Sequence, residues 1–341
     1  MIPNTVALEE YLKPLNEFIN DSTISEILIN RPQRLFLERK GVFQERESDL
    51  LTHRHLMGLA NLIARYSAQR LSEKEPLLSG QLPSGHRIQI ILPPATAKDR
   101  MVISIRKQTI ENIGLDDYIQ FNTFANTKIC YLPSHRQKQA PLSSDDADLV
   151  KLFNDKKMVE FLKLAVERKK NILISGATST GKTTFLNACL KSIPAHEHLV
   201  TLEDVPELKP FHRLHTPLFT SKGLQGVSNV TMQDLVQASL RIRPDRIIMG
   251  ELRGAEAADF IHATATGHDG SLSSVHASSP HVAFMRLVHM VKLNGTNLSR
   301  EDILEDLHTV IDIVVQLKRR VEGDLHYREV SDIYYADAMP C

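Results

Sequence analysis

The chain has 341 residues, of which 42% are hydrophobic and 24% charged, which is typical of a globular protein long enough for two domains. Lysine plus arginine and aspartate plus glutamate each number 41, so the bulk charge gives no indication of a nucleic-acid partner. Its three cysteines (Cys130, Cys189 and Cys341) are far apart, which argues against a disulfide framework or a zinc site. Because the sequence has no signal-peptide pattern and no apolar run near the ~18 residues of a membrane helix, we expect a cytoplasmic protein.

The first part of the chain predicts mixed helices and strands. Residues 34–46 alternate as two strands with a hairpin turn at Lys40-Gly41, and residues 53–71 carry apolar side chains at helical spacing. Further strands are expected at 24–30, 87–92 and 101–107. The pattern weakens from about residue 107, and the polar, proline-containing stretch 132–148 is typical of a linker.

The second part alternates between helices and short strands, which predicts a largely parallel sheet covered on both faces. A tail hairpin is expected to turn near Glu322-Gly323-Asp324. We therefore predict an N-terminal α+β domain at 1–140, a linker at 141–150 whose start could extend back to 107, and an α/β domain at 151–341. The expected helices are 149–169, 183–190, 230–242 and 254–266, and the expected strands are 171–175, 199–204, 246–251 and 271–278.

A phosphate-binding loop is indicated by residues 176–183, which fit G-x-x-x-x-G-K-[ST] between a predicted strand and a predicted helix. The glycines let the backbone N–H groups face an anion, Lys182 is suited to the β- and γ-phosphates, and the Thr183 hydroxyl to Mg²⁺. We expect Lys182 to be a surface-facing charge. The predicted nucleotide-binding residues of this loop are Gly176, Ala177, Thr178, Ser179, Thr180, Gly181, Lys182, Thr183 and Thr184.

Two carboxylates are candidates for activating the attacking water. The strand 246–251 ends in Gly250-Glu251, so its acid stands one residue after the usual magnesium-binding aspartate, which suits Glu251 to catalysis and to holding Mg²⁺ through water. Glu203, at the end of another strand beside Asp204, could share this role, because ligands bind at the carboxyl ends of parallel strands. Either could instead be a solvated strand-end acid.

Two histidines lie at the strand expected at 271–278, one before it and one in its last part. His276 at its end could contact the γ-phosphate and respond to its loss, and His268 precedes the strand. Since a lone histidine is more often structural, neither residue carries this interpretation by itself.

Together these segments resemble one family, the secretion and pilus-motor ATPases. The order is the phosphate loop, the acidic "LED" at 202–204, "RPDRIIMGELRG" at 243–254 and "GHDGSLSSVHASSP" at 267–280. The last two are most similar to the traffic ATPases of type IV secretion systems. The resemblance implies a RecA-like second domain, a PAS-like first domain, a homo-hexameric ring, and ATP with Mg²⁺ bound between the two domains of a subunit.

The resemblance also implies roles for three arginines. Arg87 and Arg106 match the positions from which the first domain would reach the phosphates, a task suited to the planar guanidinium. Arg243, before the Glu251 strand, is a further candidate for nucleotide binding. Each could instead form a surface ion pair.

The function expected from these observations is ATP hydrolysis that powers the assembly of, or substrate transfer through, a type IV secretion system. The expected location is the cytoplasmic face of the inner membrane, with inner-membrane secretion proteins and the transferred DNA or protein as partners. Two alternatives are a pilus or type II secretion motor with the same chemistry, and a nucleotide-gated scaffold with negligible turnover.

Overall fold

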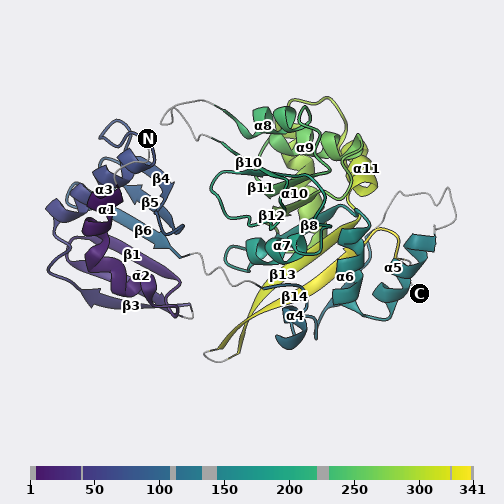
Figure 1. The fold of residues 1–341 in the computed structure, drawn as a ribbon, viewed down its shortest axis with the longest axis horizontal. Helices are drawn as coiled ribbons and strands as arrows, with labels where there is room; N and C mark the ends of the chain where they lie inside the picture. Colours follow the sequence, from purple (N-terminus) through teal and green to yellow (C-terminus); the bar gives the residue numbers. More distant parts are fainter. Residues whose placement is uncertain are drawn as a thin grey trace. The chain divides into compact units, whose positions relative to one another are not determined.

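The computed structural model describes residues 5–39, 41–107, 113–132, 144–220, 230–322 and 325–338. The chain forms two compact units, the first built from Met1–Ile110 and the second from most of the remainder (Figure 1). The first unit ends near residue 110, close to residue 107, the earliest start that we expected for the linker. Within the described ranges, no helix is both long and apolar enough to cross a membrane.

The first unit is an antiparallel sheet with helices packed on it, in the strand order β3-β2-β1-β6-β5-β4. Apolar residues on alternate positions of the strands, such as Ile27 and Ile29, meet Leu56, Leu59 and Ile63 of α3 in one core. The elements are α1 (Thr5–Leu12), α2 (Asn16–Asn20), β1 (Glu26–Arg31), β2 (Arg34–Arg39), β3 (Val42–Glu47), α3 (His53–Tyr66), β4 (Leu77–Gln81), β5 (Arg87–Ile91) and β6 (Val102–Arg106).

The second unit contains a sheet with the strand order β10-β9-β11-β12-β8-β13-β14-β7. The run from β10 to β13 is parallel throughout. Its strands are β7 (Lys128–Cys130), β8 (Ile172–Gly176), β9 (Leu199–Glu203), β10 (His215–Phe219), β11 (Arg246–Leu252), β12 (Leu272–Val275), β13 (Ile313–Glu322) and β14 (Leu325–Tyr335). Its helices are α4 (Asp117–Gln120), α5 (Ser144–Asn154), α6 (Met158–Glu167), α7 (Lys182–Leu190), α8 (Met232–Ser239), α9 (Glu256–Ala265), α10 (Pro280–Leu293) and α11 (Arg300–Val310).

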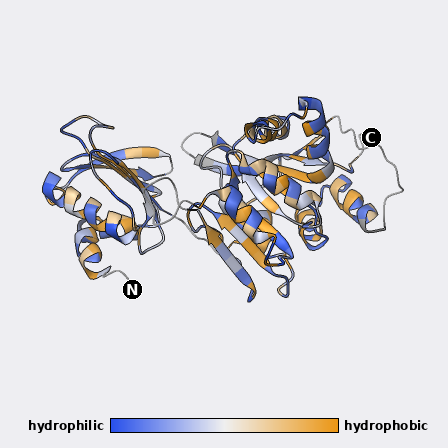
Figure 2. Ribbon diagram, turned by 90° about the horizontal axis from the view of Figure 1, so that it is seen from above, coloured by the Kyte–Doolittle hydropathy of each residue, from blue (hydrophilic) through white to orange (hydrophobic). Residues whose placement is uncertain are grey.

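Helices cover this second sheet on both faces, as the alternation of elements predicted. All residues of β8 are buried, and its side chains point alternately to the two faces of the sheet. Ile174 lies in the core shared with α6 and α7, whereas Leu173 faces a small cavity lined by α9 residues such as Phe260. Figure 2 shows apolar residues on the strands of this sheet and both apolar and polar residues along its helices.

The α/β class and most predicted strands are confirmed, but several elements differ. The stretch 149–169, predicted as one helix, forms α5 and α6, because the chain turns at Asp155–Lys157 with Lys156 at a φ of 56°. This turn brings Phe153 and Phe161 together against Tyr335. The weak stretch after residue 107 contains α4 and β7, and β7 pairs with β14. The tips of both predicted hairpins, Lys40 and residues 323–324, lie outside the described residues.

A fully buried arginine fixes the start of β11. Arg246 is 0% exposed and donates through Nε and Nη2 to the carboxylate of Glu197. Its Nη1 donates to the carbonyl oxygen of Val166 at the end of α6, at 2.6 Å. Burying a guanidinium is favourable only when its donors are paired, so this contact requires α6 and the approach to β9 to pack together.

We predict that Arg246→Ala lowers the free energy of unfolding of the second unit by about 3–5 kcal/mol, because Glu197 is left as an unpaired buried charge. Urea unfolding followed by circular dichroism measures this change. Arg241→Ala, at an exposed arginine nearby, is the matched control and should be close to neutral. Equal stabilities for the two variants would contradict a structural role for Arg246.

Candidate nucleotide-binding site

The predicted phosphate loop lies at the carboxyl edge of the parallel sheet, between β8 and α7. In the sheet, β8 is flanked by β12 and β13, and β12 separates it from β11. Because these strands are parallel, the residues at the ends of β8, β9, β11 and β12 reach the same edge. The sheet thus gathers side chains that are up to a hundred residues apart in sequence.

The loop turns through two residues with positive φ. Ser179 has a φ of 64° and Gly181 a φ of 93°, a conformation that glycine adopts without strain. Helix α7 then begins at Lys182 and runs for nine residues. Its first-turn N–H groups have no partner within the helix, so its N-terminus is suited to binding an anion. Thr180 closes the loop by donating to the carbonyl oxygen of Ala177 at 2.9 Å.

Lys182 is buried, contrary to the expectation of a surface-facing charge. Its side chain is only 8% exposed, and Nζ donates to the carbonyl oxygens of Gly176 and Ala177 at 3.0 and 3.1 Å. The cation is therefore held inside the curve of its own loop, where partial negative charges replace water. A phosphate entering the loop would meet this ammonium at its centre.

His276 connects Lys182 to Glu251. Its Nδ1 lies 3.4 Å from Lys182 Nζ and its Nε2 lies 2.8 Å from Glu251 Oε1. An ammonium can only donate and a carboxylate can only accept, so the ring fits both neighbours as the neutral tautomer with its proton on Nε2. Burial lowers the pKa of His276, and the positive charge of Lys182 lowers it further, while Glu251 opposes the shift. The structure thus favours a neutral His276 at pH 7.

Glu251 is held from both sides. Besides His276, its carboxylate accepts a hydrogen bond at 2.6 Å from Nη2 of Arg253, two residues further along the chain. The Nη1 of the same guanidinium donates to Asp204 at 2.6 Å. Since the Glu251 side chain is 17% exposed and has a donor at each oxygen, its orientation is well defined.

Glu203 occupies a different environment. It is 4% exposed, and its Oε1 accepts from the backbone N–H groups of Glu207 and Leu208 at 2.8 and 2.9 Å. A Cβ on Gly250 would lie 3.4 Å from Cγ of Glu203, so the glycine leaves room for this side chain. Gly250, at the position of the usual magnesium-binding aspartate, therefore lies next to the Glu203 side chain. A catalytic role for Glu203 stays a prediction.

An oxygen group suited to Mg²⁺ lies at the start of α7. The Thr183 hydroxyl donates to Oε2 of Glu207 at 3.2 Å, while Glu251, on β11, contacts His276. The described residues hold no group of three or more histidine, cysteine, aspartate or glutamate side chains placed to bind a metal by themselves. Mg²⁺ that accompanies a nucleotide uses one or two protein oxygens together with phosphate oxygens, and the Thr183 hydroxyl is an oxygen of this kind.

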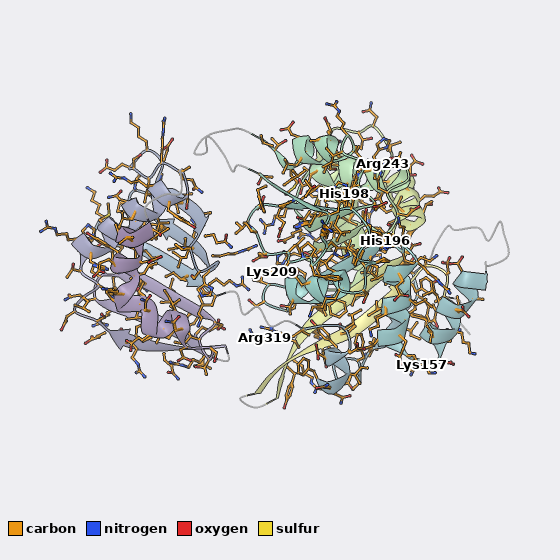
Figure 3. The ribbon with its side chains drawn as sticks, viewed as in Figure 1. Lys157, His196, His198, Lys209, Arg243 and Arg319 are labelled. Atoms are coloured by element: carbon orange, nitrogen blue, oxygen red, sulfur yellow. The ribbon has the colours of Figure 1, made fainter. Side chains whose placement is uncertain are left out.

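The three predicted arginines belong to two different units. Arg87 and Arg106 are directly opposite each other on β5 and β6 of the first unit. Arg243 precedes β11, at the amino end of the sheet, and its carbonyl oxygen lies 3.1 Å from Nδ1 of His198 (Figure 3). The structure therefore separates Arg243 from the phosphate loop of its own chain. His268 follows α9, and its Nδ1 lies 3.1 Å from the carbonyl oxygen of Ala263 in that helix. This contact holds the end of the helix.

Two residues of this site, Arg253 and Glu207, were not among the predicted ones. Arg253 follows Glu251 by two positions in "GELRG", and Glu207 follows Glu203 by four in "LEDVPEL". Their closeness to strand-end acids was a signal available in the sequence. Their partners, Asp204 and Thr183, became evident only when the strands were assembled.

The strand, glycine-framed loop and helix form a phosphate-binding loop with a buried lysine. Polar side chains from the neighbouring strands form a chain of contacts that reaches that lysine. These features define a P-loop nucleotide-binding protein of the α/β class. The family model for the type II/IV secretion system protein matches residues 9–329. This chain belongs to that family of secretion ATPases and, within it, is related to the VirB11-type ATPases of type IV secretion systems.

Curated relatives match nearly the whole chain. Type IV secretion system protein VirB11 of Bartonella quintana is 37% identical over 329 residues, covering 95% of this chain and 91% of the relative. VirB11 of Brucella suis is 35% identical over 339 residues, with 98% and 91% covered. Type IV secretion system protein PtlH of Bordetella pertussis is 34% identical, with 98% and 96% covered.

Solved structures agree in fold. The VirB11 ATPase from the Brucella suis type IV secretion system, in complex with sulphate, has a TM-score of 0.53 at 35% identity and covers 97% of this chain and 95% of that one. The pilus retraction motor PilT with bound ADP has a TM-score of 0.59 at 17% identity, with 96% and 82% covered. At that identity, PilT supports the fold alone.

We predict that the two charged neighbours of His276 shift its pKa in opposite directions, Lys182 downward and Glu251 upward. Lys182→Ala should raise the pKa of His276, because a nearby positive charge is removed, and Glu251→Gln should lower it, because a negative charge is lost. An NMR titration of the imidazole, assigned with His276→Gln, measures both shifts. Arg241→Ala serves as a control without effect. Shifts in the same direction in both variants would contradict the bridging position of the ring.

Proposed function

We propose that this chain is an ATP hydrolase that powers a type IV secretion system. The observation that carries the proposal is the continuous chain of polar contacts from the phosphate-loop lysine through His276 to Glu251. It joins the group suited to binding phosphate to the group suited to activating water. A loop that only bound a nucleotide would not require the contact between His276 and Glu251.

Binding of ATP would exchange the partners of Lys182. In the present arrangement its ammonium donates to two loop carbonyls and faces His276, and a triphosphate offers stronger, charged acceptors. The N-terminus of α7 adds the positive end of the helix dipole to the same place. The loop residues 176–184 would thus bind the phosphates mainly through backbone N–H groups and one lysine.

Hydrolysis requires a base that points at the attacking water. Glu251 is suited to this because Arg253 and His276 fix its two oxygens, and a fixed base needs little reorganisation. His276, in contact with both Lys182 and Glu251, would transmit the presence of the γ-phosphate to the base. Mg²⁺ bound with the nucleotide would neutralise charge developing on the phosphates, with Thr183 and Glu251 as its nearby oxygen groups.

The biological setting is proposed from the relatives. VirB11 and PtlH, named as type IV secretion system proteins, match this chain along nearly their entire lengths. We propose a homo-hexamer on the cytoplasmic face of the inner membrane, docked on membrane components of the machine that transfers DNA or protein. Domain motion coupled to the ATP cycle would do the work. The paired cations Arg87 and Arg106 are proposed to add positive charge to the bound phosphates.

Lys182→Ala is expected to abolish tight ATP binding. The variant removes the only phosphate-facing side-chain cation within the described loop residues 176–184, and it leaves the loop carbonyls without their donor. Isothermal calorimetry with ATP and Mg²⁺ measures the loss, and circular dichroism shows whether the buried substitution preserves the fold. An unaltered affinity would remove the phosphate-loop assignment.

Glu251→Gln is expected to slow hydrolysis by about 10²–10⁴-fold while ATP affinity stays nearly unchanged, because the amide keeps the shape but cannot accept a proton. Steady-state phosphate release gives the rate, and calorimetry gives the affinity. Glu160→Gln, on the exposed face of α6, is the matched control. Parental turnover in Glu251→Gln would transfer the role of base to another group, with Glu203 as the first candidate, and negligible turnover in the parent would favour a nucleotide-gated scaffold.

A further inference from the structure

Arg328 of β14 lies beside the phosphate loop, within the same compact unit. A Cβ built on Gly181 would lie 3.3 Å from Cδ of Arg328 and 3.9 Å from both its Nε and its Nη1. Gly181 is the residue that precedes α7, and its φ of 93° is a conformation that glycine adopts without strain. The end of the Arg328 side chain therefore lies against the last residue of the loop, where the absence of a Cβ leaves space for it.

The strand that carries Arg328 is fixed in place. Val330, two residues further along, is fully buried in the core that also contains Phe185 of α7. Its backbone N–H donates to the carbonyl oxygen of Thr123 at 3.0 Å, and its own carbonyl oxygen accepts from the Thr127 hydroxyl at 2.7 Å. Side chains two residues apart on a strand point to the same face of the sheet, so Arg328 is directed to the face that α7 covers.

The arginines of this hairpin differ in their partners. Nε of Arg320, on β13, lies 3.6 Å from the Glu329 carboxylate, and its guanidinium lies 5.4 Å from the centre of the Tyr327 ring. Arg328 is exposed, and among the residues whose side chains the structure describes its guanidinium has no ion pair or hydrogen bond. An arginine side chain has five N–H donors, so those of Arg328 are available to a ligand.

Positive charge accumulates at this point of the loop. The N-terminus of α7 carries the positive end of the helix dipole, which favours an anion and disfavours a cation. Lys182 adds an ammonium inside the loop, one residue after Gly181. A further cation at Gly181 is unfavourable by itself and becomes favourable when an anion such as the phosphate chain of a nucleotide binds among the three.

Arg328 approaches the loop from the side opposite to His276 and Glu251. In the sheet, β12 and β11 lie on one side of β8, and β13 and β14 lie on the other. The candidate base and the ring that contacts Lys182 come from the first pair of strands, and Arg328 comes from the second. Its guanidinium is therefore directed away from the candidate base and is suited to phosphates that ATP and ADP share.

We propose that Arg328 is a nucleotide-binding residue that donates to the phosphates common to ATP and ADP. The inference rests on the proposed function, because it assumes that the loop binds a nucleotide. It gives the second unit a phosphate-binding arginine of its own, in addition to Lys182. It also separates two tasks at the loop, with binding on the β14 side and activation of water on the β11 side.

The test compares the affinities of the full-length protein for three phosphate ligands. Isothermal calorimetry gives the Kd for ADP, for a non-hydrolysable ATP analogue with Mg²⁺, and for pyrophosphate. Arg328→Ala should weaken all three by roughly tenfold, because a charge-assisted hydrogen bond is lost. The kcat at saturating ATP should stay close to that of the parent, because the lost contact is made equally before and during the reaction. Arg328→Lys should recover only part of the affinity, since an ammonium lacks the planar fork.

Arg319→Ala is the matched control, because Arg319 is an exposed arginine of the same hairpin (Figure 3). It removes the same charge and should leave all three affinities at the parental value. Equal losses in Arg319→Ala and Arg328→Ala would show a general effect of hairpin charge and would overturn the inference. Circular dichroism checks that both variants keep the fold, as expected for exposed side chains.

The remaining outcomes separate this inference from the proposed function. Failure of the parent to bind either nucleotide would overturn the proposed function, and the inference with it. Equal affinity of the parent and Arg328→Ala for ADP and for the ATP analogue would overturn the inference alone. A loss for ADP that pyrophosphate does not share would assign the guanidinium to the base or the ribose, which also contradicts a phosphate contact.

Discussion

The buried Lys182 ammonium is the constraint on which the rest of this site depends. A charge that is 8% exposed must have partners, and it obtains them from the carbonyl oxygens of its own loop and from His276. These contacts curl the loop around the cation and bring the end of β12 against it. Because His276 is also in contact with Glu251, the position of the lysine is linked to that of the candidate base through one neutral ring.

The order of the strands makes this link possible. Strand β12 lies between β8, which carries the phosphate loop, and β11, which carries Glu251. A residue at the end of β12 therefore stands between the two groups, and His276 follows that strand directly. The parallel direction of all three strands brings the three ends to one edge. At the amino edge of the sheet, Arg246 and Glu197 fix the start of β11 by a buried ion pair. The candidate site lies at the carboxyl edge.

Three glutamates near the loop differ in role because they differ in partners. Glu203 is buried and accepts backbone N–H groups, Glu207 accepts the Thr183 hydroxyl, and Glu251 lies between a guanidinium and an imidazole. The first caps a turn through backbone N–H groups, the second accepts from a hydroxyl, and the third is the base that we propose. Residue type alone would have treated them as equivalent acids.

The sequence by itself determined the phosphate loop, the α/β class and the family, because each rests on local spacing: 176–183 fit a strand–loop–helix motif, and strands alternate with helices after residue 150. It also predicted Glu251 and His276, which end or follow strands. Tertiary structure alone decided that Lys182 is buried, that Arg243 lies at the opposite edge from the loop, and that Arg253 and Glu207 belong to the site. These facts depend on which strands are neighbours and on which turn meets which helix, contacts between residues distant in the chain that no local pattern records.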